Sequence, residues 1–416
     1  MIGELKKLLL VLPSNTYRAQ RFIQAAAKLD IELSIATDGD FSPPDPIGTI
    51  ISNVGFCDAR EAGQQLADIA RHRGIDSALA VDESGIEVAA WANAFLRNEI
   101  TNLDGILATR NKAQLRQILR EAGVPQPAFA EVVSDADPTQ NEQWVGYPAV
   151  VKPTKGSGSL GVTLARDIAE LREGQLIAQG VMEKMGFVGY PTLVEEYIDG
   201  AEYAVEVLVV AGVAKILAIF EKPDPLVGPT FAETIYLTPA RISKSTSEAM
   251  ASSVAAVANA LGIRTGPMHI EMRISAEGVC FPIDVASRSI GGKCSDALSF
   301  SFATTLEELI LANAASGVIP DVDREHQSSG VFMIPVEAQG VLRAVSGIAS
   351  AMQVPFVQGV EITLPLGTPV VPLPWDNQYL GFIFAKAPGP AAVEKALREA
   401  RSRLEIIIAR DCAIES

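Results

Sequence analysis

Two acidic residues, Glu271 and Asp284, are the side chains whose spacing first indicates chemistry in this sequence. They lie in MHIEMRISAEGVCFPIDVASR, which predicts two strands joined by a turn at 275–278. Because side chains alternate between the faces of a strand, both carboxylates are expected on one face, as diagonal neighbours about 7 Å apart or less. A cation between them relieves their repulsion, and hard oxygen ligands favour Mg²⁺ shared with nucleotide phosphates. The alternative is a pair of solvated surface acids.

The register implied by this turn places Glu271 opposite Pro282 and Asp284 opposite His269. The alternating residues are then expected to face a core on the other side of the hairpin: Ile270, Met272, Ile283 and Val285. Arg288 follows on the face of the two acids. Its guanidinium keeps its charge and suits a phosphate or a developing oxyanion.

A glycine-rich loop, residues 156–161, lies in VVKPTKGSGSLGVTLARD and matches the pattern G-x-G-x-x-G. A dinucleotide-binding loop opens a helix, whereas VTLA favours a strand here, and the acidic residue expected about 20 positions later is missing. A P-loop ends in Gly-Lys-Ser/Thr, and a kinase loop has its lysine after the glycines, but Lys152 precedes them. The loop therefore predicts a Gly-Ser hairpin whose backbone N–H groups approach phosphates closely. A surface hairpin without a ligand is the alternative.

Strands and helices alternate at short intervals over residues 1–108. The expected strands are KLLLVLP, IELSIATD, TIISNVG and SALAVDE, and the expected helices are TYRAQRFIQAAAKLD, AREAGQQLADIARHRG and GIEVAAWANAFLR. This alternation predicts a doubly wound parallel sheet. Its first strand–helix turn, LPSNTYR, lacks the glycines of a dinucleotide site. Asp82 and Glu83 end a strand, which is where open sheets bind ligands.

The rest of the chain divides into a middle region and a C-terminal part. TRNKAQLRQILREAGVPQPAF predicts a helix that opens the middle region, which extends to about residue 320. Beyond it, GVFMIPV, VEITLPLGTPVV and YLGFIFAK predict short strands, and PAAVEKALREARSRLEII predicts a final helix. These elements indicate a small mixed subdomain.

The bulk composition limits the classes of protein and partner. With 416 residues, 48% of them hydrophobic, the chain is long enough for two or three domains with cores of their own. A net charge of −16 argues against nucleic acids and anionic membranes as partners. Cys57, Cys280, Cys294 and Cys412 are widely spaced, which indicates reduced thiols in a cytoplasmic protein. The apolar run LLLVL is too short for a signal peptide or a membrane span.

Several of these stretches together resemble the ATP-grasp superfamily of carboxylate–amine ligases over nearly the whole chain. The resemblance rests on RNKAQL, VVKP, GSGSLGV, LVEEYIDGAEYAVEV, HIEMRI and IDVASRSIGG, which occur in the family's order. It implies an α/β and α+β architecture: an N-terminal α/β domain at 1–108, an ATP-grasp domain at 109–320 with a flap subdomain at about 125–195, and a small mixed subdomain at 321–416. YLGFIFAKAPGPAAVEKALREARSRLEIII and VLPSNTYRAQRFIQAAAKL are most similar to the L-amino-acid ligase branch.

The resemblance implies a nucleotide site as well. Lys112 and Lys152 are the implied lysines on either side of the α- and β-phosphates. Glu195 is implied to accept a hydrogen bond from the adenine amino group, and Glu202 to bind the ribose hydroxyls. The other implied ATP contacts are the flap residues Ser157, Gly158 and Ser159 and the segment Glu196, Tyr197 and Ile198.

The same resemblance assigns the metal and the charge near the transferred phosphate. Glu271 and Asp284 match the carboxylates that hold one or two Mg²⁺ ions, with Mn²⁺ as the alternative metal. Arg288 matches the arginine near the transferred phosphate and is, with Lys152, an implied catalytic residue. The family commonly has Glu where Asp284 stands and Asn where Ala286 stands. In this chain, a second ion would therefore have a shorter carboxylate and one amide oxygen fewer as ligands.

The implied activity is ATP-dependent amide-bond formation between amino acids or related acids and amines, through an acyl-phosphate, with release of ADP and phosphate. A homodimer is the expected assembly. Candidate substrate residues are Glu233, His269, Gly291, Gly292 and Glu83. A salt bridge is the alternative role for Glu233, and a packed, hydrogen-bonded role is the alternative for His269.

Two other functions stay open on the sequence alone. One is another ATP-grasp ligase: a purine-pathway enzyme, a biotin-dependent carboxylase subunit or an acyl-CoA-forming ligase. The other is a nucleotide-binding regulatory protein that has lost catalysis, which Asp284 and Ala286 motivate.

Overall fold

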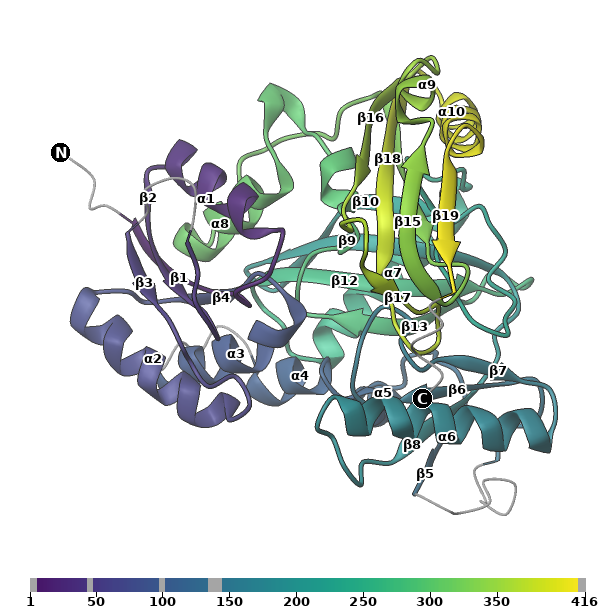
Figure 1. Cartoon of the computed structure of the whole chain (residues 1–416). Helices are drawn as coiled ribbons and strands as arrows, with labels where there is room; N and C mark the ends of the chain where they lie inside the picture. The colour runs from purple at the N-terminus through teal and green to yellow at the C-terminus, as the bar shows by residue number, and fades with distance from the viewer. Residues whose placement is uncertain (1–5, 43–47, 97–101, 134–143, 411–416) are drawn as a thin grey trace.

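The computed structural model describes residues 6–42, 48–96, 102–133 and 144–410 (Figure 1). The N-terminal domain lies at one side of the molecule, and the glycine-loop region and the C-terminal strands lie at the other (Figure 1). Within these ranges, no helix is both long enough and apolar enough to cross a membrane. Cys57, Cys280 and Cys294 are free thiols, whereas Cys412 and residues 134–143 of the expected flap region lie outside the described residues.

The N-terminal domain contains the predicted parallel sheet, with strand order β3-β2-β1-β4. Its elements are β1 (Lys6–Val11), α1 (Ala19–Lys28), β2 (Ile31–Ala36), β3 (Thr49–Ile51), α2 (Ala59–Arg73), β4 (Ala78–Ala80), the 3₁₀ turn η1 (Glu83–Gly85), α3 (Ile86–Phe95) and α4 (Leu103–Ala108). Along β1, Leu8 and Leu10 pack with α1, whereas Leu9 and Val11 pack with α2 and α3. Both faces of the sheet are therefore covered, as its continuous apolar strands require.

The centre of this sheet fixes where a ligand can approach. β1 pairs with β2 on one side and with β4 on the other, so the chain order reverses between β1 and β4. Loops after the carboxyl ends of these two strands open a crevice. The loop that contains Asn15 and Tyr17 follows β1, and Asp82 and Glu83 follow β4.

The middle of the molecule is an eight-stranded sheet with order β13-β12-β9-β10-β11-β14-β18-β16. Its strands are β9 (Ala201–Val210), β10 (Val213–Glu221), β11 (Ile235–Thr238), β12 (Gly266–Ile274), β13 (Cys280–Ala286), β14 (Ser328–Pro335), β16 (Val357–Ile362) and β18 (Tyr379–Ala387). α7 (Lys244–Ala260), α8 (Leu306–Ser316) and α10 (Pro390–Ser402) pack against it. The expected domain boundary near residue 320 does not separate two sheets. Strands β14, β16 and β18 belong to the same sheet as β9 to β13.

The alternation of side chains along β9 and β12 separates the core from the site. Val205, Val207 and Val209 of β9, with Met268, Ile270 and Met272 of β12, pack under α7. Because neighbouring residues point to the opposite face, Glu202 and Glu206 of β9 and His269, Glu271 and Arg273 of β12 share the other face. Strand periodicity thus gathers charged side chains on one side of the sheet.

The glycine-loop region is a four-stranded antiparallel sheet with order β5-β8-β6-β7. It consists of β5 (Phe129–Val132), β6 (Ala149–Pro153), β7 (Thr163–Ala165) and β8 (Thr192–Glu196), with α5 (Lys112–Glu121) before it and α6 (Ile168–Lys184) across it. β6 and β7 form the predicted Gly-Ser hairpin. Asp167 caps α6 by accepting from the Ala169 and Glu170 N–H groups, and the helix extends to Lys184.

The C-terminal part departs from the sequence prediction in two places. The predicted final helix is wrong beyond Ser402: α10 ends there, and β19 (Glu405–Ala409) pairs with β15 (Gly340–Ser346). Three consecutive isoleucines, which are β-branched, favour a strand at that point. The predicted strand VEITLPLGTPVV is divided into β16 and β17 (Pro369–Val370), which belong to different sheets. The remaining short elements are α9 (Ile348–Met352), η3 (Cys294–Ala297) and η4 (Ser301–Ala303).

Candidate active site

A single cavity of about 940 Å³ lies where the β1–β4 crevice, the glycine loop and the charged face of the large sheet meet. All of the candidate residues named from the sequence line it: Lys112, Lys152, Ser157, Gly158, Ser159, Glu195, Glu196, Tyr197, Ile198, Glu202, Glu233, His269, Glu271, Asp284, Arg288, Gly291, Gly292, Asp82 and Glu83. Residues far apart in the sequence therefore converge on one site.

The predicted register of the acidic hairpin is wrong by a small shift. Glu271 lies directly opposite Asp284 and not diagonal to it, and His269 lies opposite Ala286. The turn is one residue longer than predicted, since Ile274 pairs with Cys280, and a bulge between Glu271 and Met272 adds a second residue; Ile283 lines the cavity instead of the core. The two acids still share a face, because directly paired residues point to the same side of a sheet.

Lys112 connects Asp284 with the glycine loop. Its Nζ lies 3.2 Å from Asp284 Oδ1 and donates to the Gly156 carbonyl at 2.9 Å. Lys112 is the first residue of α5, which Asn111 caps by accepting from two backbone N–H groups. The cap holds the lysine where β13 and the glycine loop meet.

Lys152 and Glu195 form a buried cluster with Arg116, a residue that the sequence did not single out. Arg116 Nε lies 2.5 Å from Glu195 Oε1, and Lys152 Nζ lies 2.6 Å from Glu195 Oε2. Burial opposes ionisation of Glu195, but the charges of Arg116 and Lys152 outweigh it and hold the pKa at about 2. Burial lowers the pKa of Lys152, against the field of Glu195. Glu195 thus lines the cavity with both oxygens engaged by protein cations.

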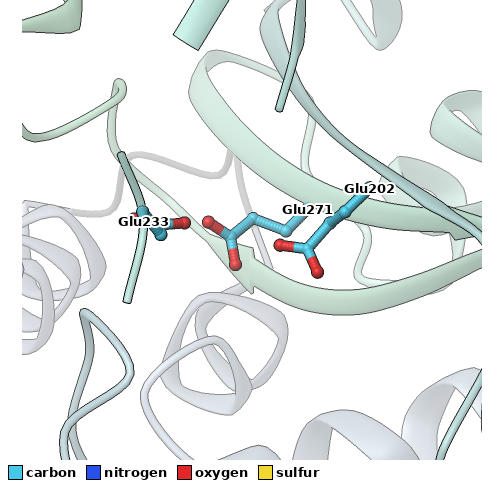
Figure 2. A group of neighbouring side chains, drawn as sticks. All are labelled: Glu202, Glu233 and Glu271. Atoms are coloured by element: carbon cyan, nitrogen blue, oxygen red, sulfur yellow. The ribbon is translucent and has the colours of Figure 1, made fainter. Parts of the chain in front are cut away.

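Three acidic side chains surround Lys222, a second residue that the sequence did not single out. Glu202, Glu233 and Glu271 point toward one another from β9, from the loop before β11 and from β12 (Figure 2). Lys222 Nζ lies 2.7 Å from Glu202 Oε1 and 3.0 Å from Glu271 Oε1, and it also contacts Glu233 Oε1. Burial lowers the pKa of Lys222, but the three carboxylates raise it well above its ordinary value. We call Glu202, Glu233 and Glu271 the three-carboxylate cage.

His269 is held between two carboxylates. Its Nδ1 lies 2.6 Å from Glu206 Oε1, and its Nε2 lies 3.6 Å from Glu271 Oε1. Burial lowers the pKa of His269, but the bonds to Glu206 and Glu271 raise it to about 9. The geometry therefore favours the packed, ion-paired role over that of a general base. Glu206 also accepts from the Ile290 N–H at 2.9 Å, which fixes the loop that follows Arg288.

Arg288 is oriented by the N-terminal domain. Its Nε lies 2.6 Å from Glu83 Oε2, and Arg110 contacts the other oxygen of that carboxylate. Burial opposes ionisation of Glu83, but Arg288 and Arg110 hold its pKa at about 2. Glu83 therefore positions Arg288 in this structure, which differs from the substrate contact considered from the sequence.

The glycine loop is held by the C-terminal part of the chain. The Gly161 N–H donates to the Pro374 carbonyl at 2.8 Å, and Asn377 Nδ2 donates to the Ser157 carbonyl at 3.1 Å. Gly158 has a φ of +63°, and a Cβ there would lie 2.6 Å from Asn377 Nδ2. The positive φ favours glycine at this position, and a side chain there would have to displace the Asn377 amide.

The end of the cavity beside Glu233 is largely apolar. Tyr236, Met333 and Phe382 line it and are buried. Glu233 receives both Lys222 and the Tyr236 hydroxyl on Oε1. Gly292 has a φ of +58° and packs closely on this wall, since a Cβ there would lie 2.3 Å from Met333 Sδ.

The two depressed carboxyl pKa values predict a loss of stability in acid. Glu83 and Glu195 have pKa values of about 2, below the ordinary 4.5, so their stabilisation is complete above pH 4.5 and is lost as the pH falls toward 2. Each contributes about 3 kcal/mol to the free energy of unfolding at neutral pH. Urea unfolding between about pH 6 and pH 3 measures this loss, and Glu195→Gln should show the shallower fall. An unfolding free energy that is constant over this range would contradict the assignment.

Family models match two of the parts of the chain that line the cavity. The ATP-grasp domain matches residues 145–297, and the L-amino acid ligase C-terminal domain 2 matches residues 332–409. The uncharacterized protein y4rH of Sinorhizobium fredii is 29% identical over 294 residues, which cover 70% of this chain and 59% of that protein. The chain spans less than two thirds of the length of the curated relatives it matches.

Solved structures have the same fold. The L-amino acid ligase from Bacillus licheniformis is similar at a TM-score of 0.83 and 24% identity, over 98% of this chain and 100% of that one. A second similar structure is the biotin carboxylase domain of Hydrogenobacter thermophilus 2-oxoglutarate carboxylase, solved in complex with MgADP, ADP and bicarbonate. It has a TM-score of 0.68 and 17% identity, and the match covers 98% of this chain and 92% of that one. Residues 145–297 therefore match the ATP-grasp domain, residues 332–409 match the L-amino acid ligase C-terminal domain 2, and the solved structures share the fold.

Proposed function

We propose that this protein is an ATP-dependent ligase that joins an amino-acid carboxylate to an amine through an acyl-phosphate, with release of ADP and phosphate. One observation carries the proposal: the cations and loop that suit a triphosphate, the paired acids that suit a metal and the candidate substrate residues line the same cavity. Mixed charge and an apolar end suit a ligand that has both phosphates and an amino-acid part.

The donors expected for phosphates are only partly used within the protein. Lys152 Nζ contacts Glu195 at 2.6 Å and the Ile283 carbonyl at 3.4 Å, so one of its three N–H donors is left among the described residues. Lys112 Nζ contacts the Gly156 carbonyl and Asp284, so among the described residues it also has one N–H donor left. Both lysines can therefore bind phosphate oxygens without leaving their protein partners.

The metal fits the carboxylates that face each other on β12 and β13. The contacts that described residues make with Glu271 go to Oε1, which leaves Oε2 for an ion. Asp284 is about a third exposed and lines the cavity. Mg²⁺ bound there would neutralise charge on the phosphates. Ala286 supplies only a methyl group opposite His269, so we propose one ion held by Glu271 and Asp284.

The reaction proceeds in two steps, and the protein contributes position and charge. A substrate carboxylate oxygen attacks the γ-phosphorus, and the bond from that phosphorus to the ADP oxygen breaks. An amine then attacks the acyl carbon, phosphate leaves, and the amine nitrogen loses a proton. Arg288 and Lys152 stabilise the charge on the transferred group, and the glycine loop keeps water from the acyl-phosphate.

The apolar end of the cavity indicates the amino acid. Glu233 Oε2 would accept the substrate ammonium, and the side chain would pack on Tyr236, Met333 and Phe382. We therefore expect an apolar side chain on the acid that is activated. ADP release with a panel of amino-acid pairs tests the function: release that needs two amino acids supports it, and release that needs bicarbonate or coenzyme A, or ATP binding without turnover, contradicts it.

Asp284→Asn tests the metal assignment. The variant should raise the Mg²⁺ concentration for half-maximal activity by about tenfold or more, because a neutral amide oxygen replaces a charged ligand. Glu277→Gln, in the turn of the same hairpin, is the matched control and should leave that concentration unchanged. An Mg²⁺ requirement that Asp284→Asn does not change would remove Asp284 from the site.

A further inference from the structure

We propose that Lys222 is the resident cation of the three-carboxylate cage and keeps a divalent ion off Glu271 until a nucleotide binds. The inference rests on the proposed function only for the identity of Glu271 as a metal ligand. It assigns Lys222 as a positioning residue that determines when the metal enters.

The geometry of the cage fits an ammonium group in number and distance. A lysine has three N–H donors, and Lys222 has three carboxylate acceptors, two of them at 2.7 and 3.0 Å. The ligand oxygens of Glu202, Glu233 and Glu271 all lie within 4.8 Å of one another. Figure 2 shows these carboxylates directed toward a common centre. The side chain of Lys222 is 3% exposed, so water does not replace its contacts.

Lys222 supplies part of the positive charge that compensates the carboxylates of the cage. Arg273 Nε lies 2.9 Å from Glu202 Oε2, and His269 lies between Glu271 and Glu206, so Lys222, Arg273 and His269 face four carboxylates. A metal on Glu271 Oε2 would share one carboxylate with Lys222, because Lys222 already contacts Oε1. Two cations so close in a buried site repel strongly. A divalent ion therefore binds Glu271 only when Lys222 has moved or when bound phosphates add compensating negative charge.

This arrangement explains how Glu271 stays ionised and in place before a ligand arrives. Burial opposes its ionisation, but Lys222 and His269 hold its pKa well below the ordinary value. A carboxylate that is already charged and fixed in place needs no reorganisation when the metal arrives. Lys222 thus keeps the metal ligand ready and, at the same time, denies the free protein a metal.

The test measures Mn²⁺ binding to the nucleotide-free protein, by the loss of the free-ion signal in electron paramagnetic resonance. Lys222→Met should bind one Mn²⁺ at least about tenfold more tightly than the wild type, because removing the ammonium leaves uncompensated carboxylates. Lys215→Met is the matched control: it removes the same charge from an exposed position on β10 and should bind Mn²⁺ like the wild type. Equal affinities of Lys222→Met and the wild type would overturn the proposal.

Two further measurements locate the effect and cover a variant that does not fold. Adding Glu271→Gln to Lys222→Met should abolish the gained Mn²⁺ site, and a site that persists lies outside the cage and contradicts the inference. The wild-type protein without nucleotide should show no Mn²⁺ site that Glu271→Gln removes; finding one overturns the proposal whatever Lys222→Met does. No amino acid or turnover is involved, so a failure here is distinguishable from a failure of the ligase function.

Discussion

Arg288→Ala is expected to lower kcat for ADP formation by about 10²–10³-fold, with a much smaller change in KM for ATP. Arg288 lines the cavity together with the glycine loop and the acidic hairpin, and in the proposed reaction its guanidinium stabilises the transferred phosphoryl group. Because that charge develops in the transition state, its loss should appear mainly in kcat.

Two variants separate the charge of Arg288 from its orientation. Arg288→Lys keeps a cation but loses the planar contact with Glu83, so its kcat should fall between those of the wild type and Arg288→Ala. Glu83→Gln leaves the guanidinium and weakens the contact that orients it, and it should lower kcat by about tenfold. Arg343→Ala, at an exposed position on β15, is the control and should change neither constant. Activity retained in Arg288→Ala would remove Arg288 from the mechanism.

The part of the site that the sequence predicts is the part formed by local periodicity. The prediction that Glu271 and Asp284 share a face survives because the register at Glu271 differs from the predicted one by two residues, and side chains two residues apart point to the same face. The bulge itself has no signal in HIEMRI or FPIDVA, since it depends on how β12 also pairs with β9. The same local argument identified the Gly-Ser hairpin, because VTLA favours a strand directly after the loop.

The residues that the sequence missed are those whose partners lie far away in the chain. Lys222 has partners from β9, β12 and the loop before β11, and nothing in the letters EKPD indicates that these will meet. Glu206 is similar, since its contacts with His269 and Ile290 follow only from the pairing of β9 with β12. Arg116 has one local signal: it follows Lys112 by one helical turn and therefore shares its face.

The continuity of the large sheet was missed for a related reason. Strands β14, β16 and β18 read as a separate mixed unit because their turns and alternation change after residue 320. The structure joins them to β11 through β14, a pairing between segments that are distant in the sequence. Periodicity identifies strands, but it does not identify which strands pair.

The buried charge cluster of Arg116, Glu195 and Lys152 predicts the largest effect on stability. Arg116→Met is expected to lower the free energy of unfolding by about 3–5 kcal/mol, because removing one partner leaves Glu195 buried with only Lys152 to compensate it. Arg116 also donates to the Pro282 and Ile283 carbonyls at 2.9 and 2.8 Å, so the variant frees two acceptors beside Asp284. The methionine replaces the arginine's apolar stem but none of its five donors.

Urea unfolding followed by circular dichroism measures this loss, and a second arginine of the same helix provides the control. Arg120 is exposed on α5, and Arg120→Met should cost less than about 1 kcal/mol. Adding Glu195→Gln to Arg116→Met should recover part of the stability, since the buried charge that lost its partner is then gone. If Arg116→Met and Arg120→Met are equally stable, the cluster does not hold α5 to β8, and the placement of Lys152 by Glu195 needs another explanation.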